Sequence, residues 1–284
     1  MIRTTRRCLL ALLIPALAIS STAHAQLGLA MQEAQPPTSK WVVNYAEDMC
    51  TIERNYGTLS SKLVFGIRAE TMGFGGQIII LKQGGLSEFR DRSIKIILDP
   101  VKPPLTVQAT AQRIKDDGTT KFTFRLDRDQ MTELEKSYQI KISDAGHPIF
   151  ALSLPAMRAG LAALETCRVD LVAGWGIAPA DQKRIKSGPK VVGGSVIRLF
   201  QAGDYPTEAL RQNQQGVVRF RVDVYKTGKV KDCIVTHSSG VPSLDTETCS
   251  IVRSRAHYSP AVDVEGEPKA SIEVDTITWL IPSQ

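Results

Sequence analysis

The sequence has 284 residues and a formal net charge of +6, with 35 basic and 29 acidic side chains. Three of the basic residues, Arg3, Arg6 and Arg7, lie in a leader that we expect to be removed, and the remaining 32 leave a net charge of +3. This near balance predicts no nucleic-acid partner. The length is enough for one large or two ordinary domains.

Residues 1–25 have the three parts of a secretory signal peptide. The arginines precede an apolar run from Cys8 to Ile19, and the small residues at 23–25 predict cleavage before Gln26. About a dozen apolar residues are too few for a membrane-spanning helix, which needs roughly 18 to 20. We therefore expect an exported protein; a leader that stays uncleaved and anchors the chain in the inner membrane is the alternative.

Residues 40–174 predict a strand-rich α+β domain. Apolar alternation and short apolar runs indicate strands at 62–70, 76–83, 93–100, 104–114 and 121–127. The strands at 76–83 and 93–100 are expected to be buried on both faces. Asp116, Asp117 and Gly118 predict a hairpin turn between the last two strands.

Two helices are expected at the end of this domain. The first follows a cap at Asp127 or Asp129 and carries Met131, Leu134 and Tyr138 at helical spacing. The second starts near Pro155 and carries Cys167. Residues 175–195, rich in proline, glycine and lysine, predict a linker to a second domain.

From residue 196 the expected order is helix, strand, strand, helix, strand. A short helix should run from about Pro206 to Gly216. A hairpin should follow, with Val218, Phe220, Val222 and Val224 on one face. A second helix is expected over 243–257, and residues 269–282 predict the last strand.

Several short motifs of this region occur in an order and spacing that resemble the TonB C-terminal domain family over residues 196–284. They are Tyr205-Pro206, Gly216, Val222-Asp223, Gly228, Ser238-Ser239-Gly240, Leu244-Asp245, Tyr258-Ser259-Pro260-Ala261 and Gly266. The resemblance implies a three-stranded antiparallel sheet with two helices on one face, in the periplasm. It also implies that a sheet edge binds an extended segment of an outer-membrane receptor by strand addition. The first domain resembles no family that we recognise.

The last strand is the candidate partner-binding edge, with Ser271, Glu273, Asp275, Ile277 and Trp279. Trp279 could anchor a partner, although a place in the core is an equally good interpretation. We expect a periplasmic binding or scaffold protein with a role in TonB-type transmembrane transport. Two alternatives stay open: an enzymatic first domain that the second docks to the envelope, and an anchored energy transducer.

Four cysteines remain once Cys8 leaves with the leader. An even number of cysteines in an exported chain indicates disulfides, although four cysteines permit three pairings. We favour Cys50 with Cys167, which would join the first segment of the first domain to its last helix. Cys233 on a strand and Cys249 on the helix packed against it form the second expected pair.

Zinc binding is the competing interpretation of the second pair, with Cys233, His237, Cys249 and His257 as ligands. Only the first two have a spacing typical of zinc sites. Cys249 and His257 would lie about 12 Å apart along a helix, too far to converge on one ion. We therefore predict no metal site and no cofactor.

His237, Ser239 and Asp245 are the residue types of a hydrolase triad. No Gly-x-Ser-x-Gly nucleophile elbow accompanies them, and the serines lie in an expected turn. The glycine-rich segment 73–76 precedes a strand, whereas a nucleotide-binding loop follows one. We predict no catalytic residue and do not expect an enzyme.

Overall fold

The computed structural model describes residues 33–58, 61–84, 86–100, 103–114 and 118–281. Residues Glu33–Gln284 form one compact unit. The predicted signal peptide and the turn residues Asp116 and Asp117 lie outside the described residues. In the described part of the chain, no helix is both long and apolar enough to cross a membrane.

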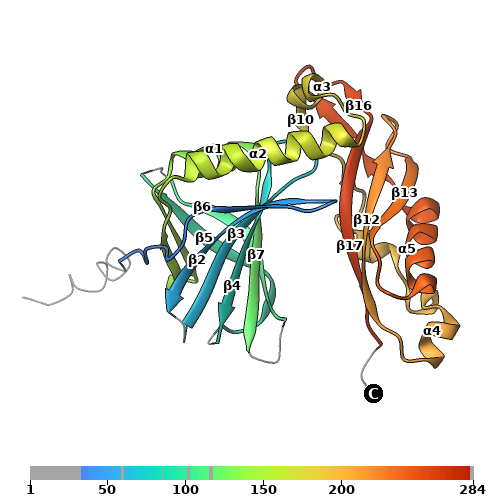
Figure 1. Cartoon of the computed structure of the whole chain (residues 1–284), viewed down its shortest axis with the longest axis horizontal. Helices are drawn as coiled ribbons and strands as arrows, with labels where there is room; N and C mark the ends of the chain where they lie inside the picture. The colour runs from blue at the N-terminus through green and yellow to red at the C-terminus, as the bar shows by residue number, and fades with distance from the viewer. Residues whose placement is uncertain (1–32, 59–60, 85, 101–102, 115–117, 282–284) are drawn as a thin grey trace, which may run out of the picture. The chain divides into compact units, whose positions relative to one another are not determined.

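The first half of the chain forms a nine-stranded sheet in which all neighbouring strands are antiparallel (Figure 1). Along the sheet the order is β1-β2-β3-β4-β7-β6-β5-β8-β9. The strands are β1 Val42–Tyr45, β2 Cys50–Thr58, β3 Ser61–Ala69, β4 Gly76–Gln83, β5 Phe89–Asp99, β6 Leu105–Arg113, β7 Thr119–Leu126, β8 Gln139–Asp144 and β9 His147–Ser153. All five strands predicted for this region are present.

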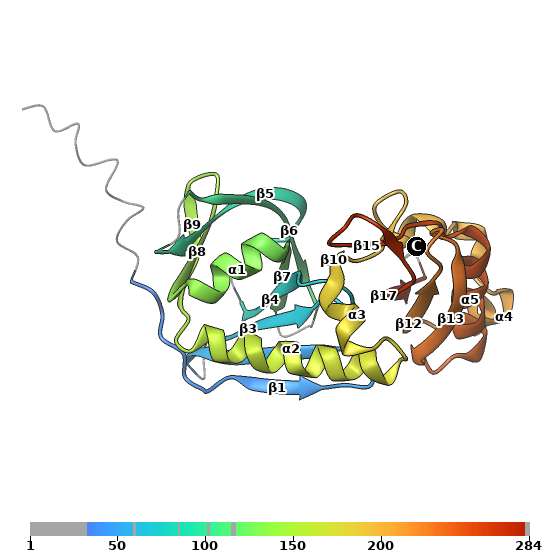
Figure 2. The same ribbon diagram turned by 90° about the horizontal axis from the view of Figure 1, so that it is seen from above.

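The segment before β1 joins the two sides of this sheet. Gln35 pairs with Leu152 of β9, and Pro37 pairs with Tyr56 of β2. The amide of Gln35 donates to the carbonyl of Ala151 at 2.8 Å. The strands therefore curve around on themselves, as Figure 2 shows, and the curvature encloses one apolar core.

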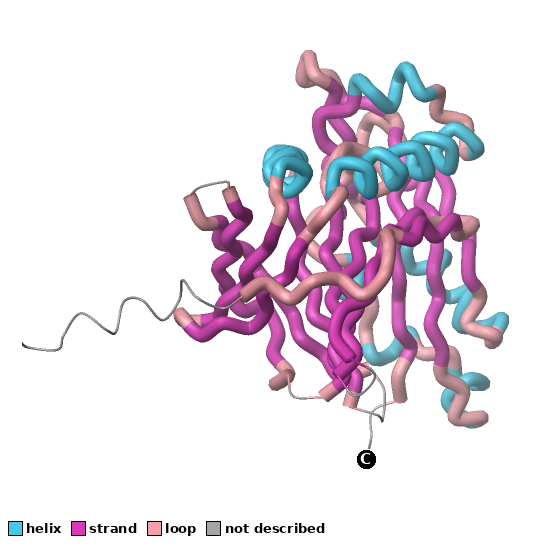
Figure 3. The backbone as a smooth tube through the Cα atoms, turned by 60° about the vertical axis from the view of Figure 1, so that its left-hand side comes forward, coloured by secondary structure: helices cyan, strands magenta, loops and turns pink. Residues whose placement is uncertain are grey.

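Two helices, α1 (Arg128–Lys136) and α2 (Met157–Gly174), lie across one end of the curved sheet (Figure 3). The helix α1 begins as predicted, because Asp127 caps it and Gln130 completes a capping box. Met131 and Leu134 of α1 and Leu164 of α2 belong to the core, together with apolar residues from both halves of the sheet. The prediction for Tyr138 is wrong, because α1 ends at Lys136 and Tyr138 is exposed.

The prediction that 76–83 and 93–100 are buried on both faces is wrong. In β4, buried and half-buried residues alternate, and β5 exposes Arg90 to Ser93 and Lys95 to solvent. A curved antiparallel sheet with its core on the inside leaves the other face to water, so one face of each strand stays accessible.

The segment 175–195 contains regular structure where a linker was expected. It holds α3 (Pro179–Arg184), β10 (Ile185–Ser187) and β11 (Lys190–Val191). The strand β10 pairs with β15 (Ala261–Asp263), which also pairs with β16 (Pro268–Lys269), and β11 pairs with β14 (Tyr258–Ser259). Two 3₁₀ turns, η1 (Val196–Leu199) and η2 (Ala202–Asp204), follow.

The C-terminal part contains the predicted three-stranded antiparallel sheet, in the order β13-β12-β17. Its elements are α4 Thr207–Arg211, β12 Gly216–Val224, β13 Val230–His237, α5 Pro242–Arg255 and β17 Ser271–Trp279. The alternating valines and Phe220 of β12 face α5 and form a second core with it. The fold is therefore α+β, as expected from the sequence.

The helix α4 is shorter than predicted. It ends at Arg211, and Asn213 takes a left-handed conformation with φ of 51°. The side chain of asparagine tolerates this conformation better than most, and a helix cannot continue through it.

Candidate functional site: the outer strand of the C-terminal sheet

Both disulfides have the pairing favoured from the sequence. Cys50 at the start of β2 is bonded to Cys167 of α2, and Cys233 of β13 is bonded to Cys249 of α5. Among the described residues, no group of three or more His, Cys, Asp or Glu side chains is arranged to hold a metal ion.

The polar cluster after β13 is a turn motif. The Asp245 carboxylate accepts hydrogen bonds from the Ser239 amide at 2.9 Å and from the Ser238 and Ser239 hydroxyls at 2.5 and 2.7 Å. Asp245 therefore bonds to the serines directly, whereas in a triad it would orient His237. It fixes the chain where it enters α5.

Two of the five residues expected at the binding edge belong to the core. Ile277 is buried, and Trp279 is only 5% exposed. The indole Nε1 of Trp279 donates to Thr248 Oγ1 at 2.9 Å, and its ring packs edge-on against Phe200 and Tyr205. The Trp279 side chain is therefore a core residue and not a surface anchor for a partner.

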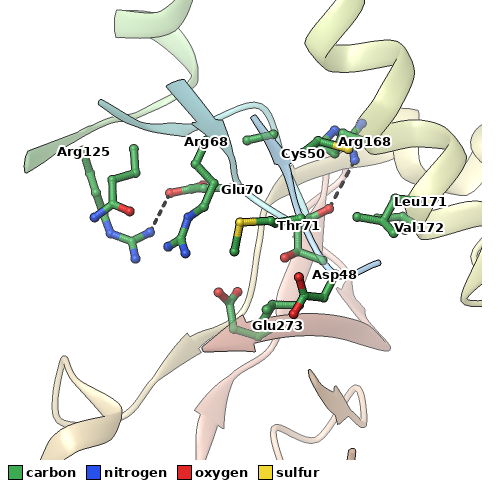
Figure 4. A pocket seen from close by; sticks show the side chains of 14 residues that line it. Asp48, Cys50, Arg68, Glu70, Thr71, Arg125, Arg168, Leu171, Val172 and Glu273 are labelled. Atoms are coloured by element: carbon green, nitrogen blue, oxygen red, sulfur yellow. Dashed lines mark hydrogen bonds and ion pairs between the residues drawn. The ribbon is translucent and has the colours of Figure 1, made fainter. Parts of the chain in front are cut away.

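The first half of β17 is buried within the chain. Ser271, Ile272 and Val274 are all less than a tenth exposed. Val274 and Glu273 line a cavity of about 20 Å³ together with residues from the first half of the chain. Figure 4 shows Glu273 and Asp48 beside this cavity, with Arg68 of β3 opposite them. This volume holds about one water molecule, so the first half of β17 is closed to a partner strand.

The two acidic residues expected at the edge, Glu273 and Asp275, are half-buried. Burial, reinforced by the charge of Asp275, raises the pKa of Glu273 to about 8. Burial also raises the pKa of Asp275. The arginines Arg68 and Arg125 act in the opposite direction on both groups but do not cancel the effect. The folded protein therefore favours the protonated form of Glu273 more than the unfolded chain does.

The face of the sheet away from α5 contacts the first half of the chain. Asp48, only 3% exposed, accepts hydrogen bonds from Arg219 of β12 and from Thr236 of β13. The guanidinium of Arg221 lies 5.3 Å from the ring centroid of Trp175. No motif of the sequence indicated these contacts, because their partners are far apart in the chain.

The outer strands of the C-terminal sheet are β13 and β17. In both strands, hydrogen bonds to acidic side chains show which main-chain groups point away from the central strand β12. The Thr276 amide donates to its neighbour Asp275 at 3.0 Å, and the Cys233 amide donates to its neighbour Asp232 at 2.7 Å. Main-chain groups alternate with a period of two along a strand. Thr276 and Thr278 of β17 therefore direct their amides and carbonyls away from β12, as does Cys233 of β13.

The edge of β13 is capped by side chains. The Cys233 amide is held by Asp232, and the Cys233 carbonyl accepts a hydrogen bond from Arg253, which also pairs with Asp232 at 3.2 Å. A partner strand would have to displace all these contacts. Such side-chain cover is a common protection of sheet edges.

The second half of the β17 edge is open. Thr278 is exposed, and no hydrogen-bond partner of its main chain lies on the outer side within the described residues. Val217, which lies directly opposite Thr278, is 43% exposed, and Leu280 is 64% exposed. Thr278 and Leu280 are two positions apart and face the same side. An open main-chain edge therefore lies beside a small apolar surface.

One comparison with known proteins finds a match, and it covers the C-terminal sheet. No curated protein and no solved structure matches the chain. Residues 201–279, which contain the open edge, match the family described as Gram-negative bacterial TonB protein C-terminal, so this part of the chain is similar to TonB C-terminal domains.

Proposed function

We propose that this protein is an exported periplasmic binding or scaffold protein that acts without catalysis. Its C-terminal sheet binds an extended segment of an outer-membrane receptor or another envelope protein along the second half of β17. The complex takes part in TonB-type transmembrane transport. The observation that carries the proposal is the difference between the two edges of the sheet: β13 is capped, whereas β17 is open at Thr278.

Strand addition at this edge would use the outward amide and carbonyl of Thr278 and the carbonyl of Thr276. Main-chain hydrogen bonds supply affinity in this mode of recognition, and side-chain contacts supply specificity. Val217 and Leu280 offer the apolar contacts. The Thr276 amide becomes available when Asp275 releases it.

The first half of the chain supports a scaffold role. It buries the start of β17 and is held to the sheet through Asp48. The bound segment would therefore extend from Thr276 toward the end of the chain, and only a short stretch of it would form the added strand.

Peptides copied from periplasmic segments of outer-membrane receptors of the same cell can test the proposal by isothermal titration calorimetry with the full exported chain. The variant Thr278→Pro removes the outward amide and leaves the pairing of β17 with β12 intact. We expect it to weaken binding about tenfold or more. Thr278→Ala keeps the amide and should bind within about threefold of the wild type.

The opposite edge provides a second control. Arg253→Ala frees the Cys233 carbonyl on β13 and should leave peptide binding unchanged. Equal binding by the wild type and Thr278→Pro would disprove strand addition at β17. A gain of binding in Arg253→Ala would point to β13 instead.

A further inference from the structure

A separate cavity of about 280 Å³ lies between α1 and α2. The glycine-rich loop after β3 lines it with Gly73, Phe74 and Gly75. Gly73 has φ of 98°, which favours glycine. Gly73 thus permits the loop conformation that places Phe74 in the wall of the cavity.

Three arginines and two glutamates line this cavity. Two of the arginines form ion pairs with the two glutamates, and the third arginine does not. Arg158 pairs with Glu135 at 3.2 Å, and Arg168 pairs with Glu165 at 2.6 Å. Arg128 contacts no carboxylate in the part of the chain that the structure describes. Its charge is therefore available to an anion in the cavity.

The surroundings of Arg128 hold its guanidinium in place. The group stacks over the ring of Phe74, 3.9 Å from the ring centroid, and its Nη2 donates to the carbonyl of Ile185. Its Nε is buried and has no hydrogen-bond partner among the described residues. Burial lowers the pKa of Arg128, and the charges of Asp129 and Glu165 offset this only in part. A bound anion would restore the missing interaction.

The rest of the lining is largely apolar. Met131 of α1 and Leu161 and Leu164 of α2 contribute side chains to the wall, with Ala69 and Ala162 between them. The volume is near the lower end of the range for small-molecule sites, roughly 300 to 1,000 Å³. A ligand of this site therefore combines one anionic group with a short apolar body.

We propose that the cavity between α1 and α2 binds a small amphipathic monocarboxylate. Its carboxylate pairs with Arg128, and its apolar chain lies against Met131, Leu161 and Leu164. This site is independent of the β17 edge, and a failure of one proposal leaves the other standing.

Isothermal titration calorimetry of the full exported chain with decanoate, decanol and decylammonium tests the proposal. Decanoate should bind. Decanol and decylammonium, which lack a carboxylate, should bind at least about tenfold more weakly than decanoate. Equal binding of decanoate and decanol would overturn the proposal, since it would leave Arg128 without a role. An absence of decanoate binding would overturn it as well.

Variants assign the binding to the cavity. Arg128→Met should weaken decanoate binding about tenfold to a hundredfold and leave decanol binding unchanged. Arg90→Met, on the exposed face of β5, is the matched control, because it also removes one positive charge. It should change the binding of neither decanoate nor decanol. Leu161→Trp fills the apolar part of the cavity and should abolish decanoate binding with Arg128 intact. Decanoate binding that survives in Leu161→Trp would contradict the site even if Arg128→Met fails to fold.

Discussion

Nη1 of Arg219 lies 2.8 and 3.1 Å from the two carboxylate oxygens of Asp48, although the residues are 171 positions apart in the sequence. Thr236 Oγ1 donates to the same carboxylate at 2.7 Å. One buried carboxylate thus joins two strands of the C-terminal sheet to the loop before β2. Cys50, which forms the disulfide with Cys167, lies only two residues after Asp48. The ion pair at Asp48 and the disulfide at Cys50 therefore both hold this short segment in place.

Replacement of Asp48 should destabilise the protein through this contact. Asp48→Ala leaves the Arg219 guanidinium and the Thr236 hydroxyl without their partner, and we expect the free energy of unfolding to fall by about 2 to 4 kcal/mol. Urea denaturation followed by circular dichroism measures the change. Asp170→Ala, on the exposed face of α2, is the matched control and should cost less than about 0.5 kcal/mol. Equal effects of the two substitutions would show that the Asp48 contact adds nothing to stability.

The two disulfides should contribute unequally to stability. The Cys50–Cys167 bond spans 117 positions and the Cys233–Cys249 bond spans 16. In the chain-entropy model, loops of these lengths correspond to roughly 4 to 5 and about 3 kcal/mol. We expect Cys50→Ser/Cys167→Ser to lower the free energy of unfolding more than Cys233→Ser/Cys249→Ser. The reverse order in urea denaturation would rule out loop length as the main cause.

Intact mass spectrometry of the non-reduced exported protein checks the covalent state. The chain should begin at Gln26 and be four hydrogen atoms lighter than its reduced form. A retained Met1 would favour the anchored alternative, and a mass equal to that of the reduced form would contradict the disulfides.

Glu273 should make the protein less stable as the pH rises. Its pKa is about 8 in the folded protein against a usual value of 4.5. Below about pH 4.5 both states hold the proton, so this group has no effect. Between pH 4.5 and 8 the unfolded state gives up the proton and the folded state keeps it, so stability falls across this range and levels off above it.

Glu273→Gln removes this ionisation. The variant should be more stable than the wild type by roughly 1 to 3 kcal/mol at pH 8.5, and the difference should vanish near pH 4. Urea denaturation at a series of pH values measures the two curves. The exposed Glu47→Gln should follow the wild type throughout. A constant difference between Glu273→Gln and the wild type would exclude a shifted pKa as its cause.

The hydrogen bond between Trp279 and Thr248 should contribute to the second core. Trp279→Phe and Thr248→Val each remove one partner, and a double-mutant cycle should give a coupling energy of about 1 kcal/mol. Both variants should still bind receptor peptides when folded, because the Trp279 side chain does not reach the surface. If Trp279→Phe folds with little loss of stability but no longer binds receptor peptides, Trp279 contacts the partner directly.

Local patterns predicted most of the regular elements. Alternating apolar residues located β3, β6, β7, β12 and β17, and the Asp127 cap located the start of α1. Pairing of Cys50 with Cys167 followed from the expected order of elements. These features depend on residues close in sequence or on a small set of possible partners, which is why the sequence was enough.

The same patterns did not show which faces and edges the folded chain covers. The last strand was predicted as one continuous binding edge, but Ser271, Ile272 and Val274 are buried and only the part after Asp275 is open. Alternation of apolar and polar residues predicts that one face of a strand is buried, but it does not show which residues cover that face. Two of the residues beside this strand, Asp48 and Arg68, come from more than 200 positions earlier.

The sequence by itself determined the α+β class and most elements of the C-terminal sheet, and it favoured the two disulfide pairings, because propensity, periodicity and cysteine number act locally or among few choices. Only the tertiary structure decided that β13 is capped by Asp232 and Arg253, that β17 is open at Thr278, and that Arg128 faces a cavity without an ion-pair partner among the described residues. These properties arise from side chains that meet only after the chain has folded. The free energies of these contacts depend on burial and on distances between atoms. Neither can be read from the spacing of residues in the sequence.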